Sequence, residues 1–94
     1  MDSYTVIIER SSTGYGAYSP DVLGCVATGL TVEETLVLMR EALVFHLEDL
    51  ADTGQPLPRP QGIEFHLRSS GDRPEPMDFI TTIPVKEVAP GVVA

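Results

Sequence analysis

A capped, amphipathic helix in the middle of the chain constrains the fold more than any other feature. Thr31 and Glu34 have the spacing of a capping box, in which the two residues satisfy backbone amides of the first helical turn. Gly54 and the prolines that follow it indicate the end of the helix. Between these signals, apolar residues recur every three or four positions, the period of one buried helical face: Val32, Leu36, Met39, Leu43, Leu47 and Leu50. The sequence therefore predicts one helix from residue 31 to about residue 53.

The segment ahead of the helix has the composition of three short strands. Residues 4–10 are rich in β-branched side chains, and residues 15–19 follow a turn of serine, threonine and glycine. Pro20 ends the second strand because it fixes its own φ and has no amide hydrogen. Residues 24–29, bounded by glycines, have the length of a third strand returning beside the second. We predict a three-stranded antiparallel meander.

The segment after the helix begins with a proline-rich connector, residues 55–60. Residues 63–68 alternate apolar and polar side chains, which predicts a half-buried strand with His66 on its solvent-facing side. Residues 77–83 also have strand composition and end at Pro84. Residues 86–94 show no clear period and are expected to form a flexible tail or an arm that pairs with another subunit.

These elements predict an α+β fold in the order β-β-β-α-β, with one or two strands after the helix. At 94 residues the chain has room for one hydrophobic core. We expect residues 1–68 to form the α+β domain, and residues 69–94 to add a loop, an edge strand and the tail to the same domain.

Charge and composition narrow the classes of partner. Fourteen acidic and six basic residues give a formal net charge of −8, and the only lysine is Lys86. Such a surface repels nucleic acid, since phosphate binding requires clustered basic side chains. It favours a basic protein partner through electrostatic steering, or it serves solubility alone. With one cysteine, no recognisable signal peptide and no long apolar run, a soluble cytoplasmic protein without membrane contact is expected.

Two patterns on the helix surface bear on binding. Leu38, Ala42 and Phe45 project from a flank away from the main apolar stripe. They either cover the edge of the sheet or form a contact between subunits. Glu34 and Glu41 belong to an acidic line along the helix, which is typical of a solvated face.

The sequence contains no recognisable catalytic, metal or cofactor motif. Cys25 lies in a predicted strand without a base nearby in the sequence, which favours a small core residue over a nucleophile. His46 lies at the edge of the buried helical face and is interpreted as a packing residue. Neighbouring acidic residues such as Glu33 and Glu34 diverge by about 100° on a helix and cannot share a site. An enzyme is therefore not expected, and no cofactor or metal is expected.

Several separated segments share one further pattern: Gly14–Asp21, Leu23–Cys25, Gly29–Thr31, Glu33–Leu36, Arg40–Leu43 and Gly54–Pro60. In their order and spacing, these segments resemble the HicB family of antitoxins in its short, stand-alone form, without the C-terminal DNA-binding domain of many members. The resemblance implies a partial RNase H-like fold without nuclease activity. It also implies a role in binding HicA-type toxins, which are small basic ribonucleases that cleave mRNA.

The resemblance and the acidic charge together give hypothetical contact residues. We expect a toxin to meet Pro20, Asp21, Glu33, Glu34 and Glu41, and we expect no direct binding of nucleic acid. Self-association into a homodimer or homotetramer is expected through the helix flank of Leu38, Ala42 and Phe45. The alternative is an orphan HicB-like oligomeric domain with another binding role and no toxin partner.

Overall fold

The computed structural model describes residues 3–69 and 78–89. Within these residues the chain forms four strands and three helices, in the following order: β1 (Ser3–Arg10), β2 (Tyr15–Tyr18), β3 (Val26–Gly29), α1 (Val32–Asp52), α2 (Ile63–Ser69), β4 (Phe79–Pro84) and α3 (Val85–Val88). The predicted α+β fold and its three-stranded meander are confirmed.

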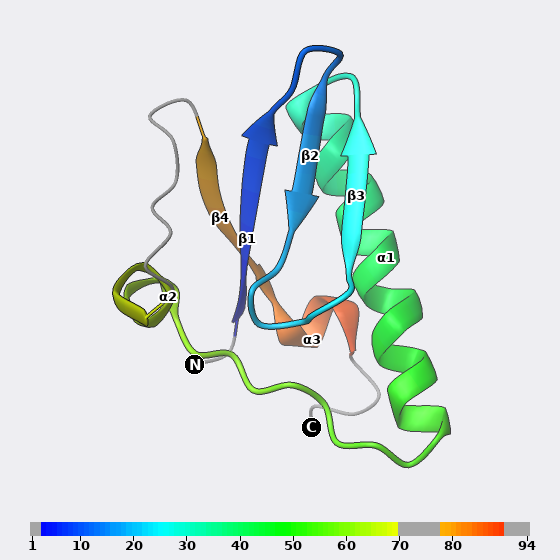
Figure 1. Ribbon diagram of the computed structural model, residues 1–94. Coiled ribbons are helices and arrows are strands. Elements are labelled where there is room, and N and C mark those ends of the chain that lie inside the picture. The colour runs from blue at the N-terminus through cyan, green and yellow to red at the C-terminus, as the bar shows by residue number, and fades with distance from the viewer. Residues whose placement is uncertain (1–2, 70–77, 90–94) are drawn as a thin grey trace.

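The strands form one antiparallel sheet in the order β3-β2-β1-β4. The strand expected after the helix is β4, and it pairs with β1 on the side that the meander leaves open (Figure 1). One row of side chains crosses all four strands, because Ile7 lies opposite both Tyr18 and Ile80, and Tyr18 lies opposite Val26. Among the described residues, β3 and β4 are therefore the two edges of the sheet.

Helix α1 starts and ends at the predicted signals. The Thr31 hydroxyl accepts a hydrogen bond from the backbone N–H of Glu34 at 3.0 Å, and Gly54 adopts the left-handed conformation (φ 75°) just after the helix. The centre of the predicted stripe is fully buried at Met39, Leu43 and Leu47. These side chains pack into one core with residues of the sheet and the C-terminal segment, among them Tyr4, Val6, Ile8, Ala17, Ile83 and Val88.

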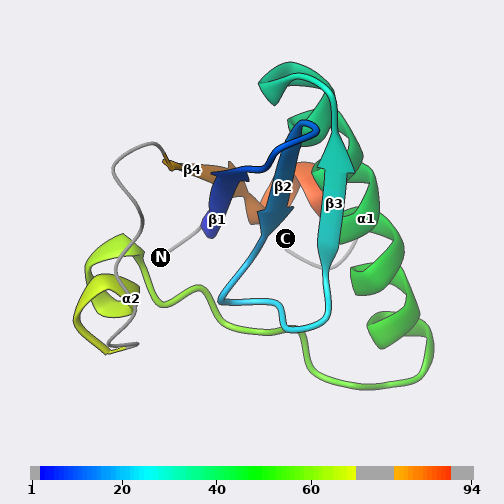
Figure 2. The ribbon, with the colours of Figure 1, turned by 45° about the horizontal axis from the view of Figure 1, so that its top comes forward.

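The two views of the ribbon place α1 behind β2 and β3, with α3 beside it (Figures 1 and 2). The connector after α1 passes below the sheet and leads to α2, which lies on the β4 side, away from α1 (Figure 2). The opposite face of β2 and β3 is not covered by a helix of the described residues.

The prediction of a strand at residues 63–68 is wrong, because this segment forms helix α2. Six residues that alternate between apolar and polar can also form a helix of less than two turns. In α2, Ile63 and His66 lie three positions apart and share the half-buried side of the helix. Glu64 and Arg68 then face solvent as an i, i+4 ion pair with a nitrogen–oxygen distance of 3.2 Å.

The flexible tail expected from residue 86 onward is wrong for residues 86–89. Val85, Val88 and Ala89 are buried in the core, and α3 includes the first two. Glu87 of α3 forms an ion pair with Arg40 of α1, so the segment is attached to the main helix. Residues 90–94 of the predicted tail and residues 70–77, with the start of the predicted edge strand, lie outside the described residues.

Candidate protein-binding surface

Three of the acidic residues predicted to meet a toxin lie exposed on α1. Glu33 and Glu34 occupy the first turn, where carboxylates are stabilised by the positive end of the helix dipole. Glu41 lies about two turns further along the same helix. A partner that binds along α1 would meet negative charge at two places.

A groove runs between α1 and the start of β3, with a volume of about 510 Å³. Its walls contain all three residues predicted for self-association together with the predicted toxin contact Glu41; the lining residues are Gly24, Cys25, Val26, Leu38, Glu41, Ala42, Phe45 and His46. The structure therefore brings residues of the two hypothetical surfaces together at one place.

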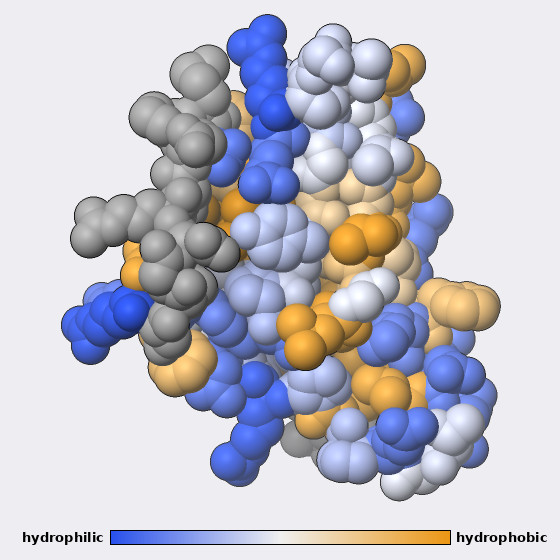
Figure 3. Space-filling view, in the orientation of Figure 1, coloured by the Kyte–Doolittle hydropathy of each residue, from blue (hydrophilic) through white to orange (hydrophobic). Residues whose placement is uncertain are grey.

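The groove has large apolar side chains that remain in contact with solvent. Phe45 is 78% exposed and Val26 is 65% exposed, whereas Leu38 is 37% exposed. Figure 3 shows hydrophobic side chains reaching the surface over β3 and the adjoining side of α1. Exposed apolar patches of this kind mark interaction sites more often than single scattered residues do.

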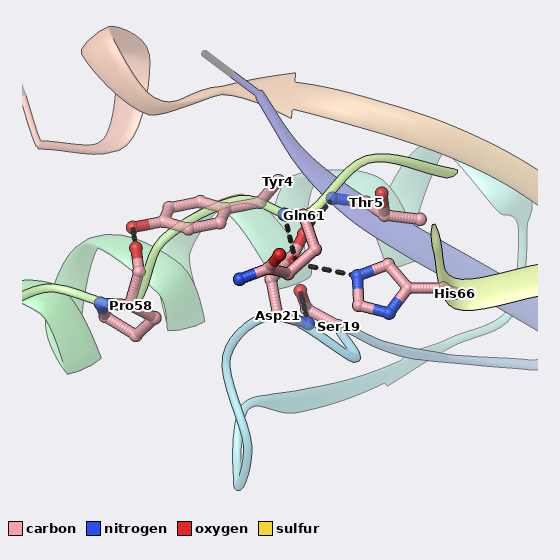
Figure 4. A network of polar contacts seen from close by, with 7 residues as sticks. All are labelled: Tyr4, Thr5, Ser19, Asp21, Pro58, Gln61 and His66. Carbon is pink, nitrogen blue, oxygen red and sulfur yellow. Dashed lines mark hydrogen bonds and ion pairs between the residues drawn. The ribbon is translucent and has the colours of Figure 1, made fainter. Parts of the chain in front are cut away.

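Asp21, also predicted to contact a toxin, lies inside the molecule (Figure 4). Its side chain has no exposed surface. Oδ2 accepts a hydrogen bond from the backbone N–H of Thr5 at 2.8 Å, and Oδ1 accepts one from the backbone N–H of Gln61 at 2.9 Å. Nε2 of His66 lies 2.7 Å from the same Oδ1. The carboxylate thus joins the turn before β3 to β1, the connector and α2, while Pro20 beside it is half-buried.

Tyr4 holds the same connector at a second point. Its hydroxyl donates a hydrogen bond to the carbonyl oxygen of Pro58 at 2.8 Å. Burial, and secondly the negative charge of Asp21, raises the pKa of the Tyr4 phenol above its ordinary value of 10.0. Tyr4 therefore remains a protonated donor at neutral pH.

Sequence reasoning missed most of this network. His66 was expected to face solvent, but its side chain is only 12% exposed. The one available signal was Asp21 after a proline, since a turn aspartate commonly accepts hydrogen bonds from backbone amides. Gln61 is joined to Asp21 across 40 positions, and no local pattern encodes such a distant pairing.

Two other residues considered in the sequence are Cys25 and His46. Cys25 is buried as predicted, at 4% exposed, but it precedes β3, which begins at Val26 and not at residue 24. Burial raises the pKa of its thiol, which disfavours the reactive thiolate. His46 is half-buried in the groove wall. Among residues 3–69 and 78–89 there is no group of three or more His, Cys, Asp or Glu side chains that could hold a metal ion. The helices of that part of the chain are also too short or too polar to cross a membrane.

Comparison with known proteins gives a family match over nearly the whole described chain. The family model described as HicB_like antitoxin of bacterial toxin-antitoxin system matches residues 4–88. An uncharacterised 14.9 kDa protein of Haemophilus phage HP1 is 35% identical over 80 residues, which cover 85% of this chain and 57% of the phage protein. A UPF0150 protein of Thermoplasma acidophilum is 34% identical over 67 residues, 70% of this chain and 97% of that protein. The chain thus spans little more than half the length of the phage relative.

Solved structures show the same fold. The N-terminal domain of Burkholderia pseudomallei antitoxin HicB has a TM-score of 0.74 at 20% identity, over 88% of this chain and 96% of that domain. A chain from the HicA3 and HicB3 toxin-antitoxin complex has a TM-score of 0.63 at 26% identity, over 85% of this chain and 93% of that chain.

Proposed function

From the premise that this chain belongs to the HicB-like antitoxin family of bacterial toxin–antitoxin systems, we propose that it binds and neutralises a small basic HicA-type ribonuclease. The observation that carries the proposal is the family match over residues 4–88. The related chain from a HicA3 and HicB3 complex supports the choice of partner class.

The charge of the chain gives this role a physical basis. A net charge of −8 attracts a basic ribonuclease and accelerates their encounter. The exposed carboxylates of Glu33, Glu34 and Glu41 would compete with RNA phosphates for the basic surface of the toxin. Pro20 is a further contact residue, at the half-buried turn between β2 and β3.

In the proposed complex, Asp21 has a structural role and does not contact the toxin. Because its carboxylate is enclosed by Thr5, Gln61 and His66, it holds the turn and the connector in place instead of meeting the partner. The protein acts by covering the toxin and performs no catalysis of its own.

The test uses a short basic HicA-type toxin encoded beside the gene for this chain. Binding is measured by calorimetry and neutralisation by the toxin's cleavage of RNA in vitro. The triple variant E33K/E34K/E41K should bind at least about tenfold more weakly, since rim charges mainly set the association rate. The loss should diminish at high salt.

The matched control is Glu64→Lys. Glu64 is also highly exposed, but it lies on α2, where it forms a surface ion pair with Arg68. The Glu64→Lys variant should bind the toxin as tightly as the unmodified chain does. Full neutralisation by the triple variant would overturn the proposed contact surface, and absence of binding by the unmodified chain would overturn the function itself and favour an orphan oligomeric domain.

A further inference from the structure

The sequence of residues 63–68 does not match the helix that they form. Ile63, Phe65 and Leu67 alternate with polar residues, which is the period of a strand. In α2, Phe65 is 48% exposed and Leu67 is 43% exposed, whereas the side chain of the polar His66 is only 12% exposed. The helix therefore leaves much of its apolar surface in contact with solvent.

Helix α2 also receives little support from apolar packing. It has seven residues, and helices shorter than about 12–15 residues are marginal in water without tertiary contacts. Among the described residues, neither the hydrophobic core nor the apolar side chains packed against it include a residue of α2. Asp21 attaches the helix through polar contacts, because its Oδ1 lies 2.7 Å from Nε2 of His66 and accepts a hydrogen bond from the N–H of Gln61 at 2.9 Å (Figure 4).

The outer edge of β4 offers the same segment a second position. No strand of the described residues pairs with this edge, and Phe79–Pro84 consists mainly of residues that favour strands. Phe79 is 49% exposed, and its ring lies 6.5 Å from that of Tyr15, which packs against the core. Helix α2 lies on the β4 side of the sheet (Figure 1). A strand added at this edge would cover Phe79.

We propose that residues 63–68 form a two-state segment. They form α2 while His66 contacts Asp21, and they add to β4 as a fifth, antiparallel strand when that contact is lost. Antiparallel neighbours need only a loop between them, and residues 69–78 separate the two segments in the chain. One sequence can adopt two packings when their free energies are close, and here each arrangement leaves some groups of the other unsatisfied.

The apolar side chains specify the register of the added strand. The register that joins the two apolar faces pairs three positions: Leu67 with Phe79, Phe65 with Thr81, and Ile63 with Ile83. Since Ile83 is buried in the core, the apolar side of the new strand then lies on the face of the sheet that carries the core. Cross-strand pairs of aromatic and aliphatic side chains stabilise such a ladder.

The two states present different surfaces at the turn before β3. In the helical state, the imidazole of His66 lies against the fully buried carboxylate of Asp21. In the strand state His66 moves away, and the turn that contains Pro20 and Asp21 loses this cover. The segment is thus a conformational device that changes the surface of the turn, and it does not depend on toxin binding.

The test is NMR spectroscopy of the full chain, because backbone carbon shifts distinguish helix from strand at each residue. Residues 63–68 should show helical shifts in the unmodified chain. His66→Val removes the contact with Asp21 and favours a strand, so these residues should change to strand shifts, with cross-strand NOEs between Leu67 and Phe79. His66→Thr, also β-branched but polar, is a second variant with the same expected change.

Adding Phe65→Glu to His66→Val should abolish these NOEs. The glutamate places a charge on the apolar side of the strand, whereas position 65 is already exposed in the helix. Helix α1 provides a matched control, since it contains the same tripeptide, Phe45-His46-Leu47. His46→Val makes the same change within a helix of 21 residues, whose shifts should stay helical. Helical or unstructured residues 63–68 in the folded His66→Val or His66→Thr chain would overturn the proposal.

Discussion

Oδ1 of Asp21 lies 2.7 Å from Nε2 of His66, although 45 positions separate the two residues in the chain. The carboxylate is fully buried, and the imidazole is 12% exposed. This contact joins α2 to the turn that precedes β3. It indicates that polar groups help to hold the connector and α2 against the sheet.

Removal of the Asp21 carboxylate should be strongly destabilising. Asp21→Ala leaves the backbone amide of the buried residue Thr5 without its acceptor, and an unsatisfied buried donor costs about 1–3 kcal/mol. It also removes the hydrogen bond from the backbone amide of Gln61, which is exposed and can bond to water instead. We expect the free energy of unfolding to fall by about 3 kcal/mol in urea titrations. Asp52→Ala, at the exposed end of α1, should change it by less than about 0.5 kcal/mol. Equal stability of the two variants would contradict the supporting role of Asp21.

The contact between Asp21 and His66 should appear as an energetic coupling. In a double-mutant cycle with Asp21→Asn and His66→Ala, residues in one hydrogen-bonded network should couple by about 1 kcal/mol or more. Hydrogen exchange should also show faster opening of α2 in His66→Ala, because the helix then loses its contact with the turn. Additive effects of the two substitutions would show that the side chains do not support each other.

The parts of the fold that the sequence predicted are those in which local and tertiary signals agree. The α1 cap at Thr31, its stop at Gly54 and its apolar stripe are all encoded within the helix itself. The meander was predictable because β-branched runs alternate with turn residues. The prediction of a strand at residues 63–68 failed because six alternating apolar and polar residues are compatible with a short helix as well as with a strand. The contact of His66 with Asp21 that accompanies the helix joins residues 45 positions apart, so the segment alone does not reveal it.

For the groove between α1 and β3, the sequence indicated which helix residues are apolar and off the buried stripe, but not which part of the sheet they lie beside. The apolar flank of Leu38 and Phe45 follows from helical periodicity alone. Its position beside the start of β3 depends on how α1 lies on the sheet, which no pattern within the helix specifies. The sequence likewise marked Asp21 as polar and placed in a turn, but its burial results from three segments that meet only in the folded chain.

The approach of α1 to β3 should be sensitive to a single methyl group at Gly29. A Cβ at this position would lie 2.7 Å from the Thr35 hydroxyl oxygen and 2.9 Å from the Thr35 backbone nitrogen. Gly29→Ala should therefore lower the free energy of unfolding by about 1–3 kcal/mol through overpacking. Gly16→Ala is the matched control within the sheet, because its Cβ would meet only the carbonyl oxygen of Ala27 at 3.9 Å. If thermal unfolding ranks the two variants as equal, the close contact is not retained in solution.

Stability should fall in strongly alkaline solution, and Tyr4 should account for part of the loss. The pKa of its phenol is raised above 10.0 by burial and by Asp21, so the unfolded chain releases this proton at a lower pH than the folded chain. The contribution of Tyr4 to stability is therefore complete below pH 10 and is lost as the pH rises above it, by up to about 1.4 kcal/mol per pH unit. Burial also raises the pKa of the Cys25 thiol above 9.0, so its part of the loss starts near pH 9.

Urea titrations of the unmodified chain, Tyr4→Phe and Cys25→Ala from about pH 8 to about pH 11 separate these contributions. At neutral pH Tyr4→Phe should be less stable by about 1 kcal/mol, since it loses the hydrogen bond to Pro58. Above pH 10 its stability should decline less steeply than that of the unmodified chain, because phenylalanine has no proton to release. Cys25→Ala should lack the earlier part of the decline, which begins near pH 9. A Tyr4→Phe curve parallel to that of the unmodified chain above pH 10 would show that the phenol ionises equally in the folded and unfolded states.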